Sequence, residues 1–167
     1  MNAFNHLLAQ ALRRAVYQVA LYFKREFRYD LVQYGVDGHE TDEQSRAFLW
    51  LDMDRPAYRG STRVFAVIGA CCFRLREWTD APPDWVMQWV WFHPYARRRG
   101  LLRKSWEHFR ERFGDFFPEP PLSRAMDAFI DSLPEGQQPG LFKQLAEAAA
   151  EYRRTEEARA AQPPAHD

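Results

Sequence analysis

Apolar residues recur at helical spacing near the start of the chain. Between Ala3 and Arg28 they fall three or four positions apart, with basic side chains on the opposite side. This pattern predicts one long amphipathic helix, either continuous or broken into two. Residues 31–36 are compatible with a short strand, and the Gly-, Asp- and Glu-rich stretch that follows predicts a surface loop.

Three further apolar segments predict strands. Residues 47–51 and 64–73 are apolar runs joined by a turn region that contains proline and glycine, so we expect them to pair antiparallel. Residues 85–92 predict a third strand, which Pro94 ends because proline cannot donate to a strand ladder.

The chain after this strand predicts mainly helices. Apolar positions at helical spacing predict a helix over residues 101–113, closed by a glycine. The apolar pair at 116–117 predicts a brief strand. Ser123 is well placed to cap a helix that includes residues 125–130, and residues 141–159 predict a last helix.

The order of these elements indicates an α/β or α+β fold, in which a sheet carries helices on its faces. We divide the chain into a helical segment at 1–30, a core at 31–135, a C-terminal helix at 139–161 and a disordered tail at 162–167.

The composition indicates a folded domain. Apolar residues make up 46% of the chain and aromatic residues 16%, which argues against a disordered protein. Lys and Arg together number 23, and so do Asp and Glu, so no global field draws the chain toward nucleic acid or an anionic membrane. Any function of the basic residues must therefore be local.

The two cysteines, Cys71 and Cys72, are neighbours within a predicted strand. Neighbouring strand residues point to opposite faces, so this pair is poorly placed to form a disulfide, which favours a reducing compartment. No apolar run approaches the roughly 18 to 20 residues that span a bilayer, and no secretory leader opens the chain. We therefore expect a cytoplasmic protein that does not associate with membranes.

Three consecutive arginines lie between the third predicted strand and the following helix. Arg97, Arg98 and Arg99 precede Gly100, and the unpaired N–H groups of the first helical turn point into this loop. Together with the helix dipole, these groups favour a phosphate. The alternative is a solvated basic face that continues through Arg103. The position of the run between a strand and a helix favours the anion site.

The strand end and the loop together resemble the acyl-CoA-binding core of the GNAT N-acetyltransferase superfamily. In that family a core strand ends in an apolar-x-apolar-x-Pro segment, and the pyrophosphate loop Arg/Gln-x-x-Gly-x-Gly/Ala opens the next helix. The resemblance covers residues 47–130, and the chain departs from the pattern at Leu102, where the family has a small residue. The residues that carry the resemblance are Val90-Trp91-Phe92-His93-Pro94 and Arg97-Arg98-Arg99-Gly100-Leu101-Leu102.

A fainter similarity links the chain to the cohesin acetyltransferase branch of that superfamily. It rests on the arginine-rich loop, on the prolines Pro120 and Pro121, and on Ser123 in place of a tyrosine. The zinc-finger cysteines and histidines of that branch have no counterpart in this sequence, so we expect no metal site.

The resemblance implies a GNAT-like fold, with a central mixed, mostly antiparallel sheet, helices on both faces, and the N- and C-terminal helices as additions. It also implies acetyl-CoA as co-substrate, with the pantetheine arm bonded to the splayed strand end and the diphosphate bound by the loop. The implied cofactor-binding residues are Val90, Trp91, Phe92, Arg97, Arg98, Arg99, Gly100, Leu101 and Leu102.

Acetyl transfer to an amine also needs a base for the amine proton and an acid near the departing sulfur. The candidates for the base are Asp84, Glu77 and His93, and Ser123 is a candidate for orienting a water or the thiolate. Each has a structural alternative, which is a solvated carboxylate, a turn residue before proline, or a helix cap. Where the family often has a tyrosine acid, this chain has Phe129.

Three functions follow from these patterns. The first is an acyl-CoA-dependent N-acetyltransferase that acts on an amine of a small molecule or a protein. The second is a GNAT-like CoA-binding or regulatory domain that has lost catalysis. The third is a nucleic-acid binder, against which the zero net charge argues. The amphipathic terminal helices leave a homodimer open.

Overall fold

The computed structural model describes residues 3–32, 34–35, 44–77 and 83–140. The chain divides into two compact units, residues 1–120 and 121–167. The predicted helical segment at 1–30 belongs to the same unit as the sheet, and the predicted core at 31–135 includes part of both units. The predicted tail and nearly all of the predicted C-terminal helix lie outside the described residues.

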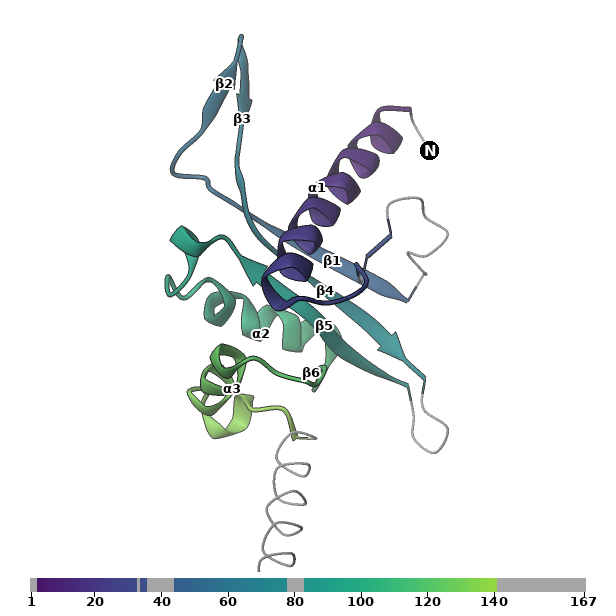
Figure 1. Cartoon of the computed structure of the whole chain (residues 1–167), viewed down its shortest axis with the longest axis vertical. Coiled ribbons are helices and arrows are strands. Elements are labelled where there is room, and N and C mark those ends of the chain that lie inside the picture. The colour runs from purple at the N-terminus through teal and green to yellow at the C-terminus, as the bar shows by residue number, and fades with distance from the viewer. Residues whose placement is uncertain (1–2, 33, 36–43, 78–82, 141–167) are drawn as a thin grey trace, which may run out of the picture. The chain divides into compact units, whose positions relative to one another are not determined.

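The first unit contains most of the secondary structure (Figure 1). Its elements are α1 (Ala3–Phe27), β1 (Ser45–Leu51), β2 (Ala57–Arg59), β3 (Thr62–Val64), β4 (Val67–Arg76), β5 (Asp84–Phe92), the 3-10 turn η1 (Pro94–Ala96), α2 (Leu101–Phe113) and β6 (Phe117–Pro118). The second unit contains α3 (Arg124–Asp131) and the 3-10 turn η2 (Glu135–Gln137). The long N-terminal helix, the three main strands, the helix over 101–113 and the Ser123-capped helix are confirmed. The short strand predicted over residues 31–36 is not present at its described residues, 31, 32, 34 and 35, and the first strand of the structure is β1.

The main sheet has four strands in the order β1-β4-β5-β6. β1, β4 and β5 pair antiparallel, whereas β6 lies parallel to β5. The sheet is therefore mixed and mostly antiparallel, and with helices on both of its faces it confirms the predicted α/β class. A register irregularity between Cys72 and Phe73 interrupts the β4–β5 ladder near its middle.

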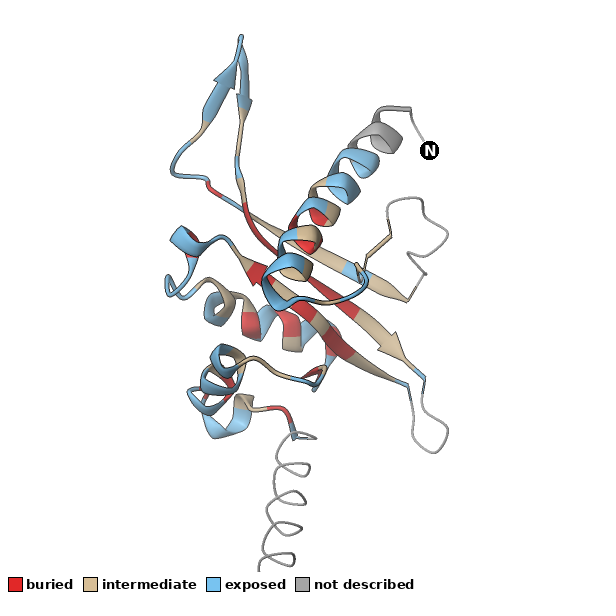
Figure 2. Cartoon of the chain, viewed as in Figure 1, coloured by how far each residue is buried: buried red, intermediate tan, exposed pale blue. Residues whose placement is uncertain are grey.

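α1 covers one face of the sheet (Figures 1 and 2). Its buried residues pack on small and aromatic side chains from alternate positions of β4 and β5, because successive strand residues point to opposite faces. Trp89 and Trp91 both lie in this layer, two positions apart on one face of β5. The cluster consists of Val16, Val19, Ala20, Ala70, Cys72, Trp89 and Trp91.

α2 covers the opposite face through a cluster of aromatic rings. Phe73 of β4 stacks on Phe113 with ring centroids 4.3 Å apart, and it meets Phe109 and Phe116 edge-on at 5.0 and 4.9 Å. Edge-on and offset ring pairs each add about 0.5–1.5 kcal/mol beyond the burial of their area. Trp106 is almost completely buried.

A short hairpin of β2 and β3 projects from the connection between β1 and β4 (Figure 1). The sequence predicts only a turn here. Its residues are exposed apart from the half-buried Val64, and Gly60 has a φ of +61° at the tip, a backbone angle that suits glycine. The hairpin escapes prediction because it has no buried face and hence no apolar alternation.

The described part of the second unit starts with a capped helix. Ser123 is the N-cap of α3, and its hydroxyl oxygen accepts a hydrogen bond from the Met126 amide at 3.3 Å. The buried residues described in this unit include Ile130 and Leu133. No helix within the described ranges of either unit is both long and apolar enough to cross a membrane.

Candidate cofactor-binding site

The edge of β5 is closed along one part and open along the other. β6 pairs only with Val86 and Met87, and the Glu119 amide then donates to the Met87 carbonyl at 3.0 Å. From Val90 to Phe92 this edge has no strand partner in the part of the chain that the structure describes. An edge of unpaired N–H and C=O groups can bind an extended ligand as an added strand.

The peptide between Phe92 and His93 shows which backbone groups this edge offers. The His93 amide donates to the Ile68 carbonyl at 2.8 Å, on the β4 side. In a trans peptide the C=O points opposite to the N–H, so the Phe92 carbonyl faces the open edge. Alternation places the amide and carbonyl of Val90 on the same side as those of Phe92, whereas those of Trp91 face β4. Of the three strand residues predicted to bind the cofactor, Val90 and Phe92 therefore present their backbone to the edge.

The loop predicted to bind phosphate connects this strand end to α2. The 3-10 turn η1 reverses the chain, with the Ala96 amide donating to the His93 carbonyl at 2.8 Å. Gly100, at φ +72°, is the N-cap of α2 and supplies no side-chain cap. Arg98 also has a positive φ, at 59°, which is uncommon for a residue with a side chain. The first-turn amides of α2, at Leu101 and Leu102, thus stand at the end of the open edge as donors for an anion.

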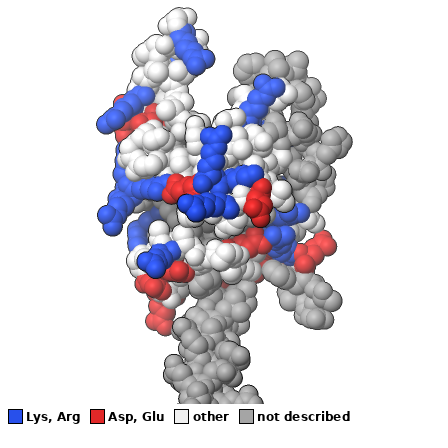
Figure 3. Space-filling model, viewed as in Figure 1, with Lys and Arg blue, Asp and Glu red and all other residues white. Residues whose placement is uncertain are grey.

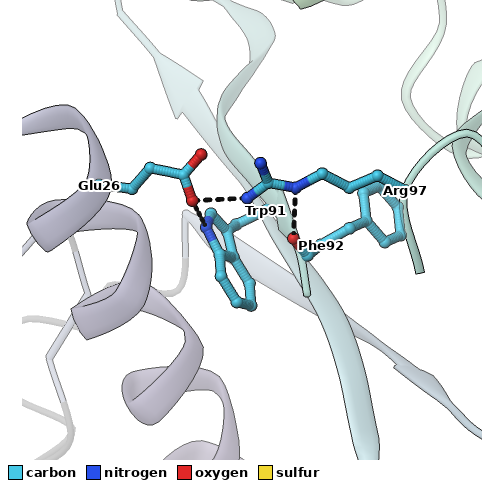
Figure 4. Close-up of polar contacts among 4 residues, drawn as sticks. All are labelled: Glu26, Trp91, Phe92 and Arg97. Atoms are coloured by element: carbon cyan, nitrogen blue, oxygen red, sulfur yellow. Dashed lines mark hydrogen bonds and ion pairs between the residues drawn. The ribbon is translucent and has the colours of Figure 1, made fainter. Parts of the chain in front are cut away.

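Arg97 is bonded to neighbouring groups of the protein, although its side chain is 39% exposed (Figure 4). Its Nε donates to the Phe92 carbonyl at 2.9 Å, and its Nη2 lies 2.5 Å from Oε2 of Glu26 in α1. The indole Nε1 of Trp91 donates to the same Glu26 oxygen at 2.8 Å. The arginine carbon Cζ lies 5.7 Å from the Trp91 ring centroid, within the range of a cation–π contact.

Glu26 is the residue of this network that the sequence analysis missed. The hydrogen bond from Arg97 lowers the pKa of its carboxyl, and the Trp91 hydrogen bond adds to this effect while partial burial opposes it. Nothing in the local pattern marks Glu26, because it lies among charged residues near the end of a helix, 71 positions before its arginine partner.

The other two arginines of the loop make fewer contacts than Arg97 does. Arg99 lies 3.7 Å from the carboxylate of Asp54, which is 84% exposed, and Arg98 has no ion pair among the described residues. On the face shown in Figure 3, basic side chains gather across the middle with acidic ones between them. The positive charge at the loop is therefore local, as the zero net charge requires. Leu102, where the sequence departs from the loop pattern, is half-buried.

The structure places two of the candidate catalytic residues, Asp84 and His93, far apart. Asp84 begins β5 and His93 follows its last residue, so at about 3.3 Å per residue they lie about 30 Å apart. The carboxylate of Asp84 accepts a hydrogen bond from the Trp85 amide at 2.8 Å. Burial raises the pKa of Asp84, and nearby Asp115 raises it further, which is the direction that a proton acceptor near neutral pH needs. His93 is exposed, with its ring 4.1 Å from that of Tyr95.

The remaining candidates have structural partners of their own. Glu77 is exposed and accepts a hydrogen bond from the Gln44 side chain at 3.1 Å. Ser123 caps α3, as described above, and Phe129 is half-buried in the same helix. In the described part of the chain, no group of three His, Cys, Asp or Glu residues is arranged to hold a metal ion.

Comparison with known proteins adds only distant similarities. No family model and no curated protein matches the chain. A point variant of the BH1408 protein from Bacillus halodurans is 12% identical over 72% of this chain and 82% of that chain, with a TM-score of 0.46. The tetramutant of the same protein is 10% identical over 70% and 83%, with a TM-score of 0.44. An aminoglycoside antibiotic 6'-N-acetyltransferase from Acinetobacter haemolyticus is 15% identical over 75% and 86%, with a TM-score of 0.40. Membership of the GNAT superfamily therefore stays a prediction.

Proposed function

We propose that this chain is a GNAT-like N-acetyltransferase that uses acetyl-CoA and acts on an amine of a small molecule or a protein. One observation carries the proposal. The open edge of β5 leads directly into a loop that ends at the uncapped N-terminus of α2, with Arg98 and Arg99 beside it. An extended ligand with a diphosphate at one end is complementary to this arrangement.

In this proposal the strand binds one part of the ligand and the loop binds the other. Val90 and Phe92 offer amide and carbonyl groups to the pantetheine arm. The amides at the start of α2 and the Arg98 side chain suit the diphosphate, because N–H groups and the helix dipole both favour negative charge there.

The reaction transfers the acetyl group from sulfur to nitrogen. The amine nitrogen attacks the thioester carbonyl carbon, the carbon–sulfur bond breaks, the amine loses a proton to a base, and the thiolate takes up a proton. The arm bonded at Val90 and Phe92 runs along β5 toward Met87, where β6 closes the edge. Asp84 lies beyond this point at the start of β5 and has a raised pKa, whereas His93 stands beside the binding loop, so Asp84 is the better of these two candidates for the base.

Thermal unfolding with and without acetyl-CoA tests the binding step. A ligand at about 100 times its Kd stabilises the fold by about 2.7 kcal/mol, which raises the Tm by about 5–10 °C for a chain of this size. Release of free CoA with a panel of amines then tests catalysis, with Asp84→Asn as the variant expected to lose it. An unchanged Tm would contradict the cofactor assignment.

A second function, CoA binding without catalysis, is favoured by a specific observation. His93 and Asp84 lie at opposite ends of one strand, and Ser123 is engaged as a helix cap. A chain that binds acetyl-CoA but releases no CoA with any amine above the buffer rate supports this binding module. Release that depends on Asp84 supports the enzyme.

A further inference from the structure

The first arginine of the loop is already engaged by the protein itself. The Nε and Nη2 donors of Arg97 lie on the same edge of the guanidinium, the edge that grips a carboxylate or phosphate with two parallel bonds. In this structure Nε is bonded to the Phe92 carbonyl and Nη2 to Glu26 (Figure 4). This edge is therefore not open to a diphosphate.

Glu26 is itself fixed in place. Its Oε2 also accepts the hydrogen bond of the Trp91 indole, and Trp91 is only 7% exposed. The Trp91 ring stacks on Tyr22, one helical turn before Glu26, with centroids 5.3 Å apart. The carboxylate thus has a defined position on α1, and the guanidinium is held between this position and the end of β5.

We infer that Arg97 is a positioning residue for the open edge of β5 and not a ligand of the diphosphate, and that Glu26 holds it in that role. The inference rests on the proposed function, because it concerns the same CoA site. Through Nε, Arg97 occupies one of the two lone pairs of the Phe92 carbonyl, which faces the open edge. It thereby orients this last edge peptide for the pantetheine arm.

In this inference the diphosphate is bound by other groups of the loop and not by Arg97. Arg98 has no ion pair among the described residues, and Arg99 has only a 3.7 Å contact to an exposed carboxylate. The first-turn amides of α2 lack a side-chain cap. These donors bind an anion without breaking an existing interaction, whereas Arg97 would have to leave both Glu26 and Phe92.

Two ligands that share a diphosphate separate the two roles. Dephospho-CoA, called CoA in this test, carries the pantetheine arm on the diphosphate of ADP, so the two ligands differ by that arm, and both are titrated calorimetrically into the full chain. We expect Arg97→Gln to weaken CoA binding about 2- to 10-fold, the range for one hydrogen bond, and to leave ADP binding unchanged. Arg98→Gln is the matched loop variant and should weaken both ligands by a similar factor.

Glu26→Gln gives the discriminating result. If Glu26 holds Arg97 in place, this variant weakens CoA binding as Arg97→Gln does, leaves ADP binding unchanged, and adds little when the two substitutions are combined. If Arg97 is a phosphate ligand that Glu26 restrains, Glu26→Gln releases it and strengthens the binding of ADP. That result, or an equal loss of ADP and CoA binding in Arg97→Gln, overturns the inference.

Two further controls separate this inference from the proposed function and from misfolding. Arg97→Lys keeps the charge but lacks the two-donor edge, so it should behave as Arg97→Gln does, and the melting temperature of each variant shows whether it is folded. An unaltered chain that binds neither CoA nor ADP contradicts the proposed function and the inference with it. If the unaltered chain binds CoA no better than ADP, the pantetheine arm does not bind to the open edge of β5. That result contradicts the inference but leaves the proposal that the loop binds phosphate.

Discussion

Gly69 lies directly opposite Phe92 across β4 and β5, so closely that a side chain at Gly69 has no room. A Cβ atom there would come within 2.4 Å of Cδ1 of Phe92 and 2.9 Å of the Trp91 carbonyl oxygen. We expect Gly69→Ala to lower the free energy of unfolding by about 1–3 kcal/mol, the usual cost of overpacking. Urea denaturation measures this change in the free energy of unfolding. Gly136→Ala is the matched control, because a Cβ there meets nothing within 4 Å, and equal stability of the two variants would refute this packing argument.

The left-handed glycine at the start of α2 gives a second prediction. Gly100 has a φ of +72° and Gly60, at the hairpin tip, +61°, and both have open space around them. Alanine at either position should cost about 1 kcal/mol through backbone strain alone. Only Gly100→Ala should also reduce the rise in Tm that CoA produces, because only this loop binds phosphate in our proposal. A similar CoA response in both variants would count against the loop.

The ion pair of Glu26 predicts a dependence of stability on acid pH. The folded-state pKa of Glu26 lies below its ordinary value of 4.5, so the unfolded chain binds more protons in that range. The contribution of Glu26 is present above pH 4.5 and is lost as the pH falls through its lowered pKa. Glu26→Gln should flatten that part of the curve of unfolding free energy against pH. Glu107→Gln, at an exposed position of α2, should leave it unchanged, and identical curves for both variants would exclude the effect.

Substitutions of Ser123 separate its role as a cap from a catalytic role. Ser123→Ala removes the hydrogen bond to the Met126 amide and should cost about 1 kcal/mol. Ser123→Asn restores a capping oxygen without a hydroxyl group, so it should recover the stability. If Ser123 is only a cap, the rate of CoA release in Ser123→Asn equals that of the unaltered chain. A rate that stays low in a fully stable Ser123→Asn variant would identify a chemical role for the hydroxyl.

The two cysteine thiols should react only when the protein unfolds. Cys71 and Cys72 are free and buried, and burial raises the pKa of Cys72 to about 12 and that of Cys71 as well. The reactive thiolate is therefore scarce at neutral pH. A thiol reagent should label neither residue in the native protein and both in denaturant. Fast labelling without denaturant would contradict the burial of this strand.

The sequence predicts the elements that bury a face. α1, β4, β5 and α2 follow apolar periodicity, and the Ser123 cap follows from residue type and position. β2 and β3 are missed because an exposed hairpin has no apolar pattern to read. β6 is predicted from two phenylalanines, but the sequence alone does not show that it pairs with only two residues of β5 and leaves the rest of that edge open.

The sequence predicts only part of the candidate site. The position of the arginines between a strand and a helix follows from the sequence, but the partner of Arg97 does not. Glu26 reaches Arg97 only because α1 packs across β5, and this packing joins residues that are 71 positions apart. The separation of Asp84 from His93 follows simply from the length of the strand between them.

The open edge of β5 also bears on how this chain behaves in a crowded solution. An exposed strand edge can pair with the same edge of another molecule, which is a common start of aggregation. Here the edge ends at three consecutive arginines, and one of them is bonded to its last carbonyl. Two copies that paired these edges in parallel would bring these charges together. The residues that suit an anion therefore also oppose the parallel addition of one copy of the sheet to another.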